Sequence, residues 1–267
     1  MDIILLIKAF ILGIVEGATE FLPISSTGHL IIAGDLLNFN DEKGKAFEII
    51  IQLAAILAVC WEYRRKLLDT AMHITSQSKA QHFVINVLLA FLPAAVIGLA
   101  FYEYIKAYLF SPFTVAIALI VGGFAILAIE RFPLKGHTKD IDAMTHKQAF
   151  QIGLAQTVSL IPGVSRAAST ILGGMLFGLN RHTATEFSFF LAIPIMVAAS
   201  SLGLYKSWHF LSMEDLPMFT VGFVTAFISA LIAIKFLLRY VASHDFKPFA
   251  WYRIVLGVIV LWYFQSS

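Results

Sequence analysis

Long apolar segments separated by short polar ones make up most of the chain. A helix needs about 20 apolar residues to cross the hydrocarbon core of a bilayer, and six segments reach or approach this length. They are residues 47–63, 83–102, 113–130, 186–205, 217–239 and 250–264. The pattern therefore predicts an all-α polytopic membrane protein with about six transmembrane helices.

Two further apolar segments are broken by polar residues and proline. The first runs from residue 3 into an acidic stretch, stops at Pro23 and resumes over residues 28–37, and the second stops at Pro162. Proline ends a helix because it lacks an N–H and clashes with the preceding turn. Short helices around a polar break predict re-entrant hairpins, which a membrane tolerates only where protein or water covers the backbone. An alternative count treats each hairpin helix as a crossing.

The two broken segments carry polar residues and prolines in the same order. The clearest match pairs Ala149-Phe150-Gln151-Ile152-Gly153 with Ala9-Phe10-Ile11-Leu12-Gly13. Gln156 then falls at the position of Glu16. After a slip of one residue, the matched pairs are Pro162 with Pro23 and Ser165-Arg166 with Ser26-Thr27. This order favours an internal repeat.

Three predicted spans lie between the two units. If neither hairpin crosses the bilayer, this odd number of crossings inverts the second unit relative to the first. Inverted repeats place their functional site where the two repeats meet. We expect a single integral-membrane domain over residues 1–267, with repeat units at approximately 1–130 and 147–264.

Basic residues are distributed unequally among the connecting segments. Eleven Lys and Arg side chains fall in three of them, residues 64–82, 131–147 and 239–253. The turns at 103–112 and 206–216 hold one each. Short loops rich in Lys and Arg stay in the cytoplasm, so the first hairpin is expected to open outward and the second inward. Lys43 and Lys45, on the expected outer side, count slightly against this topology.

Composition agrees with a membrane protein. Hydrophobic residues make up 59% of the 267 positions and charged residues 13%, against about 25% in a soluble domain. A net charge of +2 is too small to suggest a nucleic-acid partner, and the single cysteine excludes a disulfide framework. No removable signal peptide is expected, because the N-terminus lacks a basic leader and a small-residue cleavage site. Trp251, Tyr252, Trp262 and Tyr263 are interpreted as anchors at the membrane surface.

The first break gathers most of the polar chemistry. Glu16 and Glu20 lie one helical turn apart on one face, so their carboxylates repel unless a cation or a shared proton lies between them. The residues that follow add hydroxyls and an imidazole: Ser25, Ser26, Thr27 and His29. Polar groups are costly in lipid, so this cluster is interpreted as a functional site.

The two glutamates can hold Mg²⁺ or Ca²⁺ through carboxylate oxygens and leave coordination positions for phosphate. Glu20 is a candidate metal ligand or general base, and the alternative is a structural pairing with Arg166. Glu16 is a candidate metal ligand, and the alternative is a protonated structural carboxyl.

The other polar residues of this break have two interpretations each. His29 is a candidate nucleophile or general acid, or a histidine that caps a helix. Ser26 is a candidate nucleophile activated by Glu20 or His29, or a hydroxyl donor to phosphate. Ser25 and Thr27 are expected to position phosphate or to cap the helix. The sequence does not distinguish a phosphoserine, a phosphohistidine and direct attack by water.

The second break reads Pro162-Gly163-Val164-Ser165-Arg166. Ser165 can cap the following helix, whose first N–H groups bind anions, and the adjacent guanidinium strengthens such a site. Arg166 lies between apolar segments, where a lone cation is costly. It is interpreted as a phosphate clamp, and the alternative is a pairing with a glutamate that holds the repeats together. The two breaks together supply charge neutralisation, a nucleophile and an acid or base, which phosphoryl transfer requires.

The two breaks also carry a family resemblance. They closely resemble the bacterial undecaprenyl-pyrophosphate phosphatase family, also called bacitracin-resistance protein, through Glu16-Gly-Ala-Thr-Glu20-Phe-Leu-Pro-Ile-Ser25-Ser26-Thr27-Gly-His29 and Pro162-Gly-Val-Ser165-Arg166. The resemblance covers essentially the whole chain, including Phe47-Glu48…Gln52 and Glu186-Phe187-Ser188-Phe189. One departure is visible: the family usually has Ser-Gly after the arginine, where this chain has Ala167-Ala168.

The resemblance implies hydrolysis of undecaprenyl pyrophosphate to undecaprenyl phosphate and inorganic phosphate, which recycles the lipid carrier for peptidoglycan and other wall polymers. It also implies a divalent cation, a multi-pass inner-membrane location and an active site on the periplasmic side, in agreement with the charge distribution. Glu48, Gln52 and Glu186 are expected beside the site if the repeats pack together, as supporting or structural hydrogen-bonding residues.

A polyprenyl-phosphate carrier or flippase is the main alternative function. Inverted repeats with broken helices are also a transporter architecture, and a carrier would need the same anion clamp. Glutamate and histidine in one break favour chemistry, because binding alone needs no acid or base. The sequence is compatible with a homodimer but does not indicate the oligomeric state.

Overall fold

The structure is a computed structural model that describes residues 3–134, 136–207 and 212–265. Within these residues every regular element is a helix, as predicted. Lys135 of the second basic loop and part of the predicted turn at 206–216 lie outside them.

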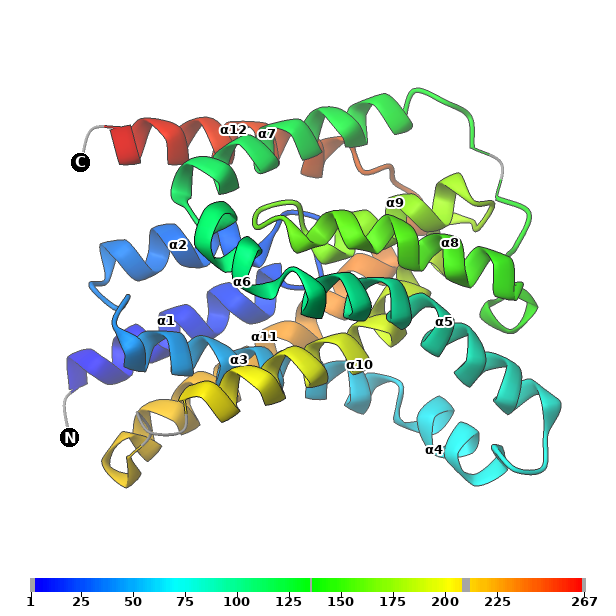
Figure 1. Cartoon of the computed structure of the whole chain (residues 1–267), viewed down its shortest axis with the longest axis horizontal. Coiled ribbons are helices and arrows are strands. Elements are labelled where there is room, and N and C mark those ends of the chain that lie inside the picture. Colours follow the sequence, from blue (N-terminus) through cyan, green and yellow to red (C-terminus); the bar gives the residue numbers. More distant parts are fainter. Residues whose placement is uncertain (1–2, 135, 208–211, 266–267) are drawn as a thin grey trace.

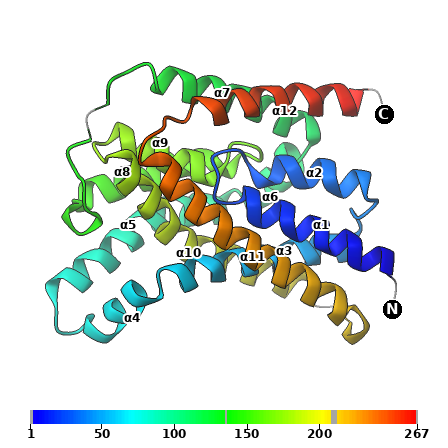
Figure 2. The same cartoon turned by 180° about the vertical axis from the view of Figure 1, so that it is seen from behind.

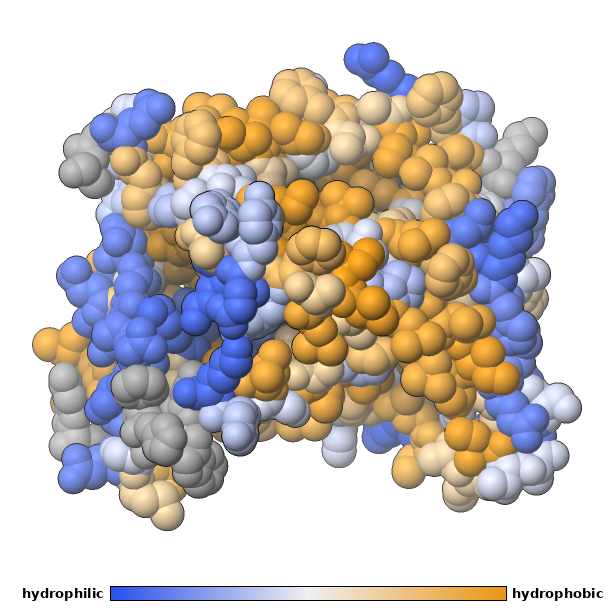
Figure 3. Space-filling model, in the orientation of Figure 1, coloured by the Kyte–Doolittle hydropathy of each residue, from blue (hydrophilic) through white to orange (hydrophobic). Residues whose placement is uncertain are grey.

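Six described helices are long and apolar enough to cross a membrane. They are α3 (Glu42–Glu62), α5 (Ser78–Ala100), α7 (Pro112–Ile129), α10 (Arg181–Ser207), α11 (Leu216–Val241) and α12 (Lys247–Gln265). Each covers one predicted span, so the polytopic α-helical fold is confirmed. Figure 3 shows, on the face it displays, an apolar middle between two hydrophilic ends, as expected for a protein surrounded by lipid.

One predicted loop was wrong in part. Residues 64–82 contain a further helix, α4 (Arg64–His73), which leads into α5. The charged residues of α4 made it resemble a loop in the sequence, but the helix is amphipathic. Leu67 packs against the apolar core, and Thr70 is buried. The remaining connections hold short helical turns, namely α6 (Tyr102–Tyr104), Ile105–Leu109, Ile141–Ala143, Thr157–Leu160 and Met213–Asp215.

Each broken segment forms two helices around a loop. The first gives α1 (Ile3–Thr19) and α2 (Ser26–Leu36), and the second gives α8 (His146–Gln156) and α9 (Arg166–Leu176). In Figure 1, α1 and α2 extend to the middle from the end that holds both termini, whereas α8 and α9 come from the opposite end. That the pairs re-enter the bilayer without crossing it, and that they form an inverted repeat, stays a prediction.

The two helix pairs have residues with similar backbone conformation at a constant separation along the sequence. Ser25 (φ 70°, ψ 100°) and Ser165 (φ 74°, ψ 115°) each precede a helix of 11 residues. Asn38 (φ 50°) and Gly178 (φ 95°) follow those helices. In backbone conformation Ser165 resembles Ser25, whereas the sequence comparison aligned it with Ser26.

Close helix contacts surround the loops. α1 lies directly against α11: a Cβ on Gly13 would come within 2.6 Å of the carbonyl oxygen of Gly222, and one on Gly17 within 2.2 Å of that of Ala226. α7 and α12 lie side by side along one edge in both views (Figure 1, Figure 2). Small residues allow such backbone approach, which drives helix association in membranes.

One buried side chain joins both loops. Arg253 of α12 is fully buried, and its guanidinium donates to the carbonyl oxygens of Pro23 (3.2 Å), Gly163 (3.0 Å), Ala118 (3.2 Å) and Leu119 (3.4 Å). Pro23 and Gly163 belong to the two loops, and the other two carbonyls belong to α7. A buried cation is costly unless its donors are satisfied. These hydrogen bonds therefore hold both the Arg253 side chain and the four carbonyl groups in place.

This position corrects the sequence analysis, which counted Arg253 among the basic residues of the 239–253 loop. Without it, ten Lys and Arg side chains remain in the three basic segments, against two in the opposite turns. The asymmetry, and with it the predicted orientation, is little changed.

Replacing Arg253 with methionine is expected to destabilise the protein by about 3 kcal/mol or more, because the loop carbonyls lose their buried partner. Thermal unfolding of the detergent-purified protein measures this, with Arg131→Met at an exposed arginine as the matched control. Equal unfolding midpoints for the two variants would contradict the assignment.

Candidate active site

The carboxylate of Glu20 links the two loops at the middle of the molecule. Its Oε1 accepts a hydrogen bond from Nη2 of Arg166 at 3.1 Å, and its Oε2 accepts one from Oγ of Ser26 at 2.5 Å. The side chains of Glu20 and Arg166 are only 9% and 12% exposed, so the ion pair is weakly screened. Three predicted site residues from two distant parts of the chain therefore lie in direct contact.

Arg166 has hydrogen-bond and ring contacts on several sides, and one of its N–H donors has no partner among the described residues. Its Nη1 donates to the backbone oxygen of Ser188 at 3.1 Å, and its guanidinium lies over the ring of Phe21 at 5.6 Å. Its Nε is buried and has no hydrogen-bond partner among the described residues. The predicted alternative, a pairing with glutamate, is thus present, and Nε is the guanidinium donor without a partner in the described part of the chain.

Glu16 lies one turn before Glu20 and is almost completely buried. Its Oε2 has no hydrogen-bond partner in the described part of the chain. Glu20, Glu48 of α3 and Arg166 all interact electrostatically with it. Buried polar atoms are nearly always satisfied, so this oxygen of the Glu16 carboxylate, unpartnered among the described residues, has room for a further partner. Gln156, which the sequence comparison aligned with Glu16, is also buried, and neither of its amide atoms has a partner among the described residues.

The donor set bears on the predicted divalent cation. No cluster of three or more His, Cys, Asp or Glu that could bind a metal occurs in the described residues. Mg²⁺, however, is commonly held by one or two carboxylates together with water and substrate phosphates. Glu16, with its unpartnered oxygen, and Glu20 fit such a site, in which the substrate completes the coordination.

His29 has a partner on each ring nitrogen. Its Nδ1 lies 2.8 Å from the carbonyl oxygen of Ser25, and its Nε2 lies 2.6 Å from the hydroxyl of Tyr252. The two rings are nearly parallel, with an interplanar angle of 7° and centroids 5.5 Å apart. The imidazole therefore bonds a carbonyl and a phenol, not the free N–H groups that a capping histidine would satisfy.

The two loop serines are not equivalent in their hydrogen bonds. Ser165 caps α9, because its Oγ accepts from the N–H of Ala168 at 3.2 Å. No side chain caps α2 after Ser25 in the described structure. The N–H groups of the first turn of α2, where Ser26 and the half-buried Thr27 lie, therefore have no side-chain acceptor and can bind an anion.

The two alanines that replace the family's usual Ser-Gly lie in the protein interior. Ala167 is fully buried and Ala168 nearly so. A serine hydroxyl at position 167 would need a buried partner of its own. Arg166 beside them makes its bonds to Glu20 and Ser188 without such a hydroxyl.

The supporting residues expected on α3 and α10 are only partly at the site. Ser188 contacts Arg166 and also bonds the hydroxyl of Thr170. Glu186, two positions earlier, points away, because residues two apart on a helix lie on nearly opposite faces. Gln52 accepts a hydrogen bond from Ser200, and Glu186 bonds to Tyr63 and lies close to His182, so neither bonds directly to Glu20 or Arg166 in the described structure.

Sequence analysis missed three residues that contact the site or its loops. The role of Ser188 was not predicted, because Ser188 lies among apolar residues and close to Glu186, whose charge made it the stronger candidate. Arg253 was assigned to a loop, and Tyr252 was interpreted as a membrane anchor. The only sequence feature that indicated a buried role for Arg253 was its position at the start of an apolar segment.

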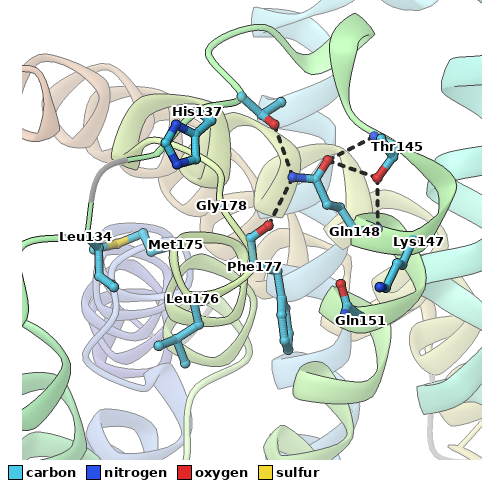
Figure 4. A pocket seen from close by; sticks show the side chains of 11 residues that line it. Leu134, His137, Thr145, Lys147, Gln148, Gln151, Met175, Leu176, Phe177 and Gly178 are labelled. Carbon is cyan, nitrogen blue, oxygen red and sulfur yellow. Dashed lines mark hydrogen bonds between the residues drawn. The ribbon is translucent and has the colours of Figure 1, made fainter.

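A separate cavity of about 620 Å³ lies at the other end of α8 and α9. Figure 4 shows Gln148 at its edge, bonded to Thr138, to Thr145 and to the carbonyl oxygen of Phe177. None of its lining residues belongs to the cluster around Glu20.

Comparisons with known proteins identify the family. A profile of the family described as "Bacitracin resistance protein BacA" matches residues 9–259. The chain is 61% identical to an undecaprenyl-diphosphatase of Methylobacillus flagellatus, over 99% of this chain and 100% of that protein. Undecaprenyl-diphosphatases of Laribacter hongkongensis and Nitrosospira multiformis are 57% and 59% identical, each over 98% of this chain and 96% of the relative. The chain therefore belongs to the bacitracin resistance protein BacA family.

Proposed function

We propose that this protein is an undecaprenyl-diphosphatase, which hydrolyses undecaprenyl diphosphate to undecaprenyl phosphate and inorganic phosphate. Such a reaction returns the lipid carrier to cell-wall synthesis and confers bacitracin resistance. The observation that carries the proposal is the contact of Glu20 with both the Ser26 hydroxyl and the Arg166 guanidinium. The identity to undecaprenyl-diphosphatases over nearly the whole chain supports it.

Ser26 is the proposed nucleophile, because its hydroxyl already donates to a carboxylate that can take the proton. Its Oγ attacks the terminal phosphorus while the bond from that phosphorus to the bridging oxygen breaks. Undecaprenyl phosphate leaves with the bridging oxygen, and a phosphoserine remains. Water then attacks the phosphoserine, which releases inorganic phosphate and restores the hydroxyl.

The surrounding groups stabilise the charge that moves during this reaction. In this proposal Arg166 and the first N–H groups of α2 bind the terminal phosphate oxygens; the absence of a side-chain cap on α2 and the unpartnered Nε of Arg166 in the described structure support it. His29 lies three residues after Ser26 and thus on the same face of α2. It is the proposed general acid for the leaving oxygen and, once deprotonated, the base for the attacking water.

The proposal includes Mg²⁺ or Ca²⁺ held by Glu16 and Glu20. A divalent cation there would neutralise phosphate oxygens and polarise the reacting phosphorus. The unpartnered Oε2 of Glu16 supports this assignment. The protein residues perform the positioning and proton transfers described above.

The membrane orientation is also part of the proposal. Ten Lys and Arg side chains in the three basic segments favour a cytoplasmic position for that end of the molecule. α1 and α2 extend from the opposite end, where both termini lie (Figure 1). In a bacterial inner membrane, the site would then open to the periplasmic side.

Glu20→Gln and Arg166→Lys are each expected to lower kcat by about 10²–10³-fold, because each removes charge or geometry that the transition state needs. Phosphate release from farnesyl or undecaprenyl diphosphate by detergent-purified protein measures this. Glu103→Gln and Arg131→Lys, at exposed positions, are matched controls. A wild-type protein that binds lipid phosphate tightly but releases none would favour the carrier instead.

Ser26→Ala is expected to lower kcat by about 10³-fold or more, because it removes the nucleophile. Ser169→Ala, which removes a hydroxyl bonded to the Ser165 carbonyl, is the control. Acid quenching during turnover should trap a phosphoserine that mass spectrometry assigns to residue 26. Retention of activity within about tenfold would indicate direct attack by water on the substrate.

Chelation is expected to abolish phosphate release, and Mg²⁺ or Ca²⁺ to restore it. Glu16→Gln should raise the cation concentration for half-maximal activity by about 10–100-fold, since one ligand is lost. Titration of activity against free cation provides the measurement. Full activity of the chelated protein would exclude the proposed cation site.

A further inference from the structure

We propose that Tyr252 is a positioning residue that acts through His29, holding its imidazole in the orientation and tautomer that proton transfer requires. The inference rests on the proposed function, because it concerns the acid–base role assigned there to His29. The observation is the 2.6 Å contact between the Tyr252 hydroxyl and Nε2 of His29, across 223 positions in the sequence.

The hydrogen bonds of His29 define which nitrogen carries the proton. The carbonyl oxygen of Ser25 can only accept, so Nδ1 must donate to it across their 2.8 Å separation. In the neutral ring, Nε2 is then unprotonated and accepts a hydrogen bond from the phenol of Tyr252. Nε2 is consequently the one nitrogen at which His29 can gain and lose a proton.

A phenol suits a partner that must tolerate both protonation states. It donates to Nε2 when the imidazole is neutral and accepts from Nε2–H when the imidazole is charged. The phenol therefore holds the ring of His29 before and after each proton transfer, and its bond to Nε2 is exchanged for one to the leaving oxygen or the water during the transfer itself. The nearly parallel arrangement of the two rings adds packing to the same constraint.

The backbone that carries Tyr252 is rigidly placed. The next residue, Arg253, bonds to carbonyl oxygens of both loops and of α7. The hydroxyl of Tyr252 thus stands at a position fixed by the same loops that carry Glu20 and Arg166. Tyr252 itself is 46% exposed, so its ring can face lipid while its hydroxyl holds His29.

The chain supplies a matched control on the same pair of helices. Tyr263 of α12 donates its hydroxyl to Oδ2 of Asp35 on α2 at 2.8 Å. Tyr263→Phe removes a tyrosine hydroxyl that joins α12 to α2, as Tyr252→Phe does, but leaves His29 untouched. If the substitutions lowered kcat only by weakening the contact between α2 and α12, both variants would show the same loss.

Tyr252→Phe is expected to lower kcat for phosphate release by about tenfold with KM nearly unchanged, because the loss concerns proton transfer and not binding. Tyr263→Phe should keep the wild-type kcat. In a His29→Ala background, adding Tyr252→Phe should cause no further loss, since the group through which it acts is absent.

Three results would overturn the inference: wild-type kcat in Tyr252→Phe, an equal loss in Tyr263→Phe, or the same tenfold loss in the His29→Ala background. Full activity of His29→Ala alone would instead refute the acid–base role assigned to His29. That result, unlike the others, is a failure of the proposed function itself.

Discussion

The rest of the structure depends on a buried cation that has no carboxylate partner among the described residues. Arg253 satisfies its guanidinium with four backbone carbonyls, two of them from loops whose residues lie about 140 positions apart. Carbonyl groups of loops that are shielded from water need hydrogen-bond donors, and a buried guanidinium needs acceptors. The loop carbonyls and Arg253 therefore satisfy each other. The tips of two helical pairs from opposite ends of the molecule are thereby held together.

The site forms because these tips meet. Glu20 comes from one loop, Ser26 from the helix that follows it and Arg166 from the start of α9, and the contact of Glu20 with Arg166 exists only when the loops face each other. Ser25 and Ser165, both at positive φ, adopt backbone conformations that cost about 1–3 kcal/mol each and persist only in well-packed surroundings. Helix contacts through Gly13 and Gly17 contribute to those surroundings.

The sequence predicted the six spans, the two breaks and the residues that meet at Glu20, because these depend on local pattern: apolar length, proline and polar groups in an apolar context. The contacts of Ser188, Tyr252 and Arg253 could not be predicted, since they depend on which helices pack together. α4 was missed because dense charge hid its amphipathic face.

A structure of the protein in a lipid bilayer with a non-hydrolysable prenyl phosphonate bound would test the central claim most directly. The account predicts the phosphonate group between Ser26, Arg166 and the first turn of α2, with a cation at Glu16 and Glu20. Binding in the cavity beside Gln148, away from both loops, would contradict it.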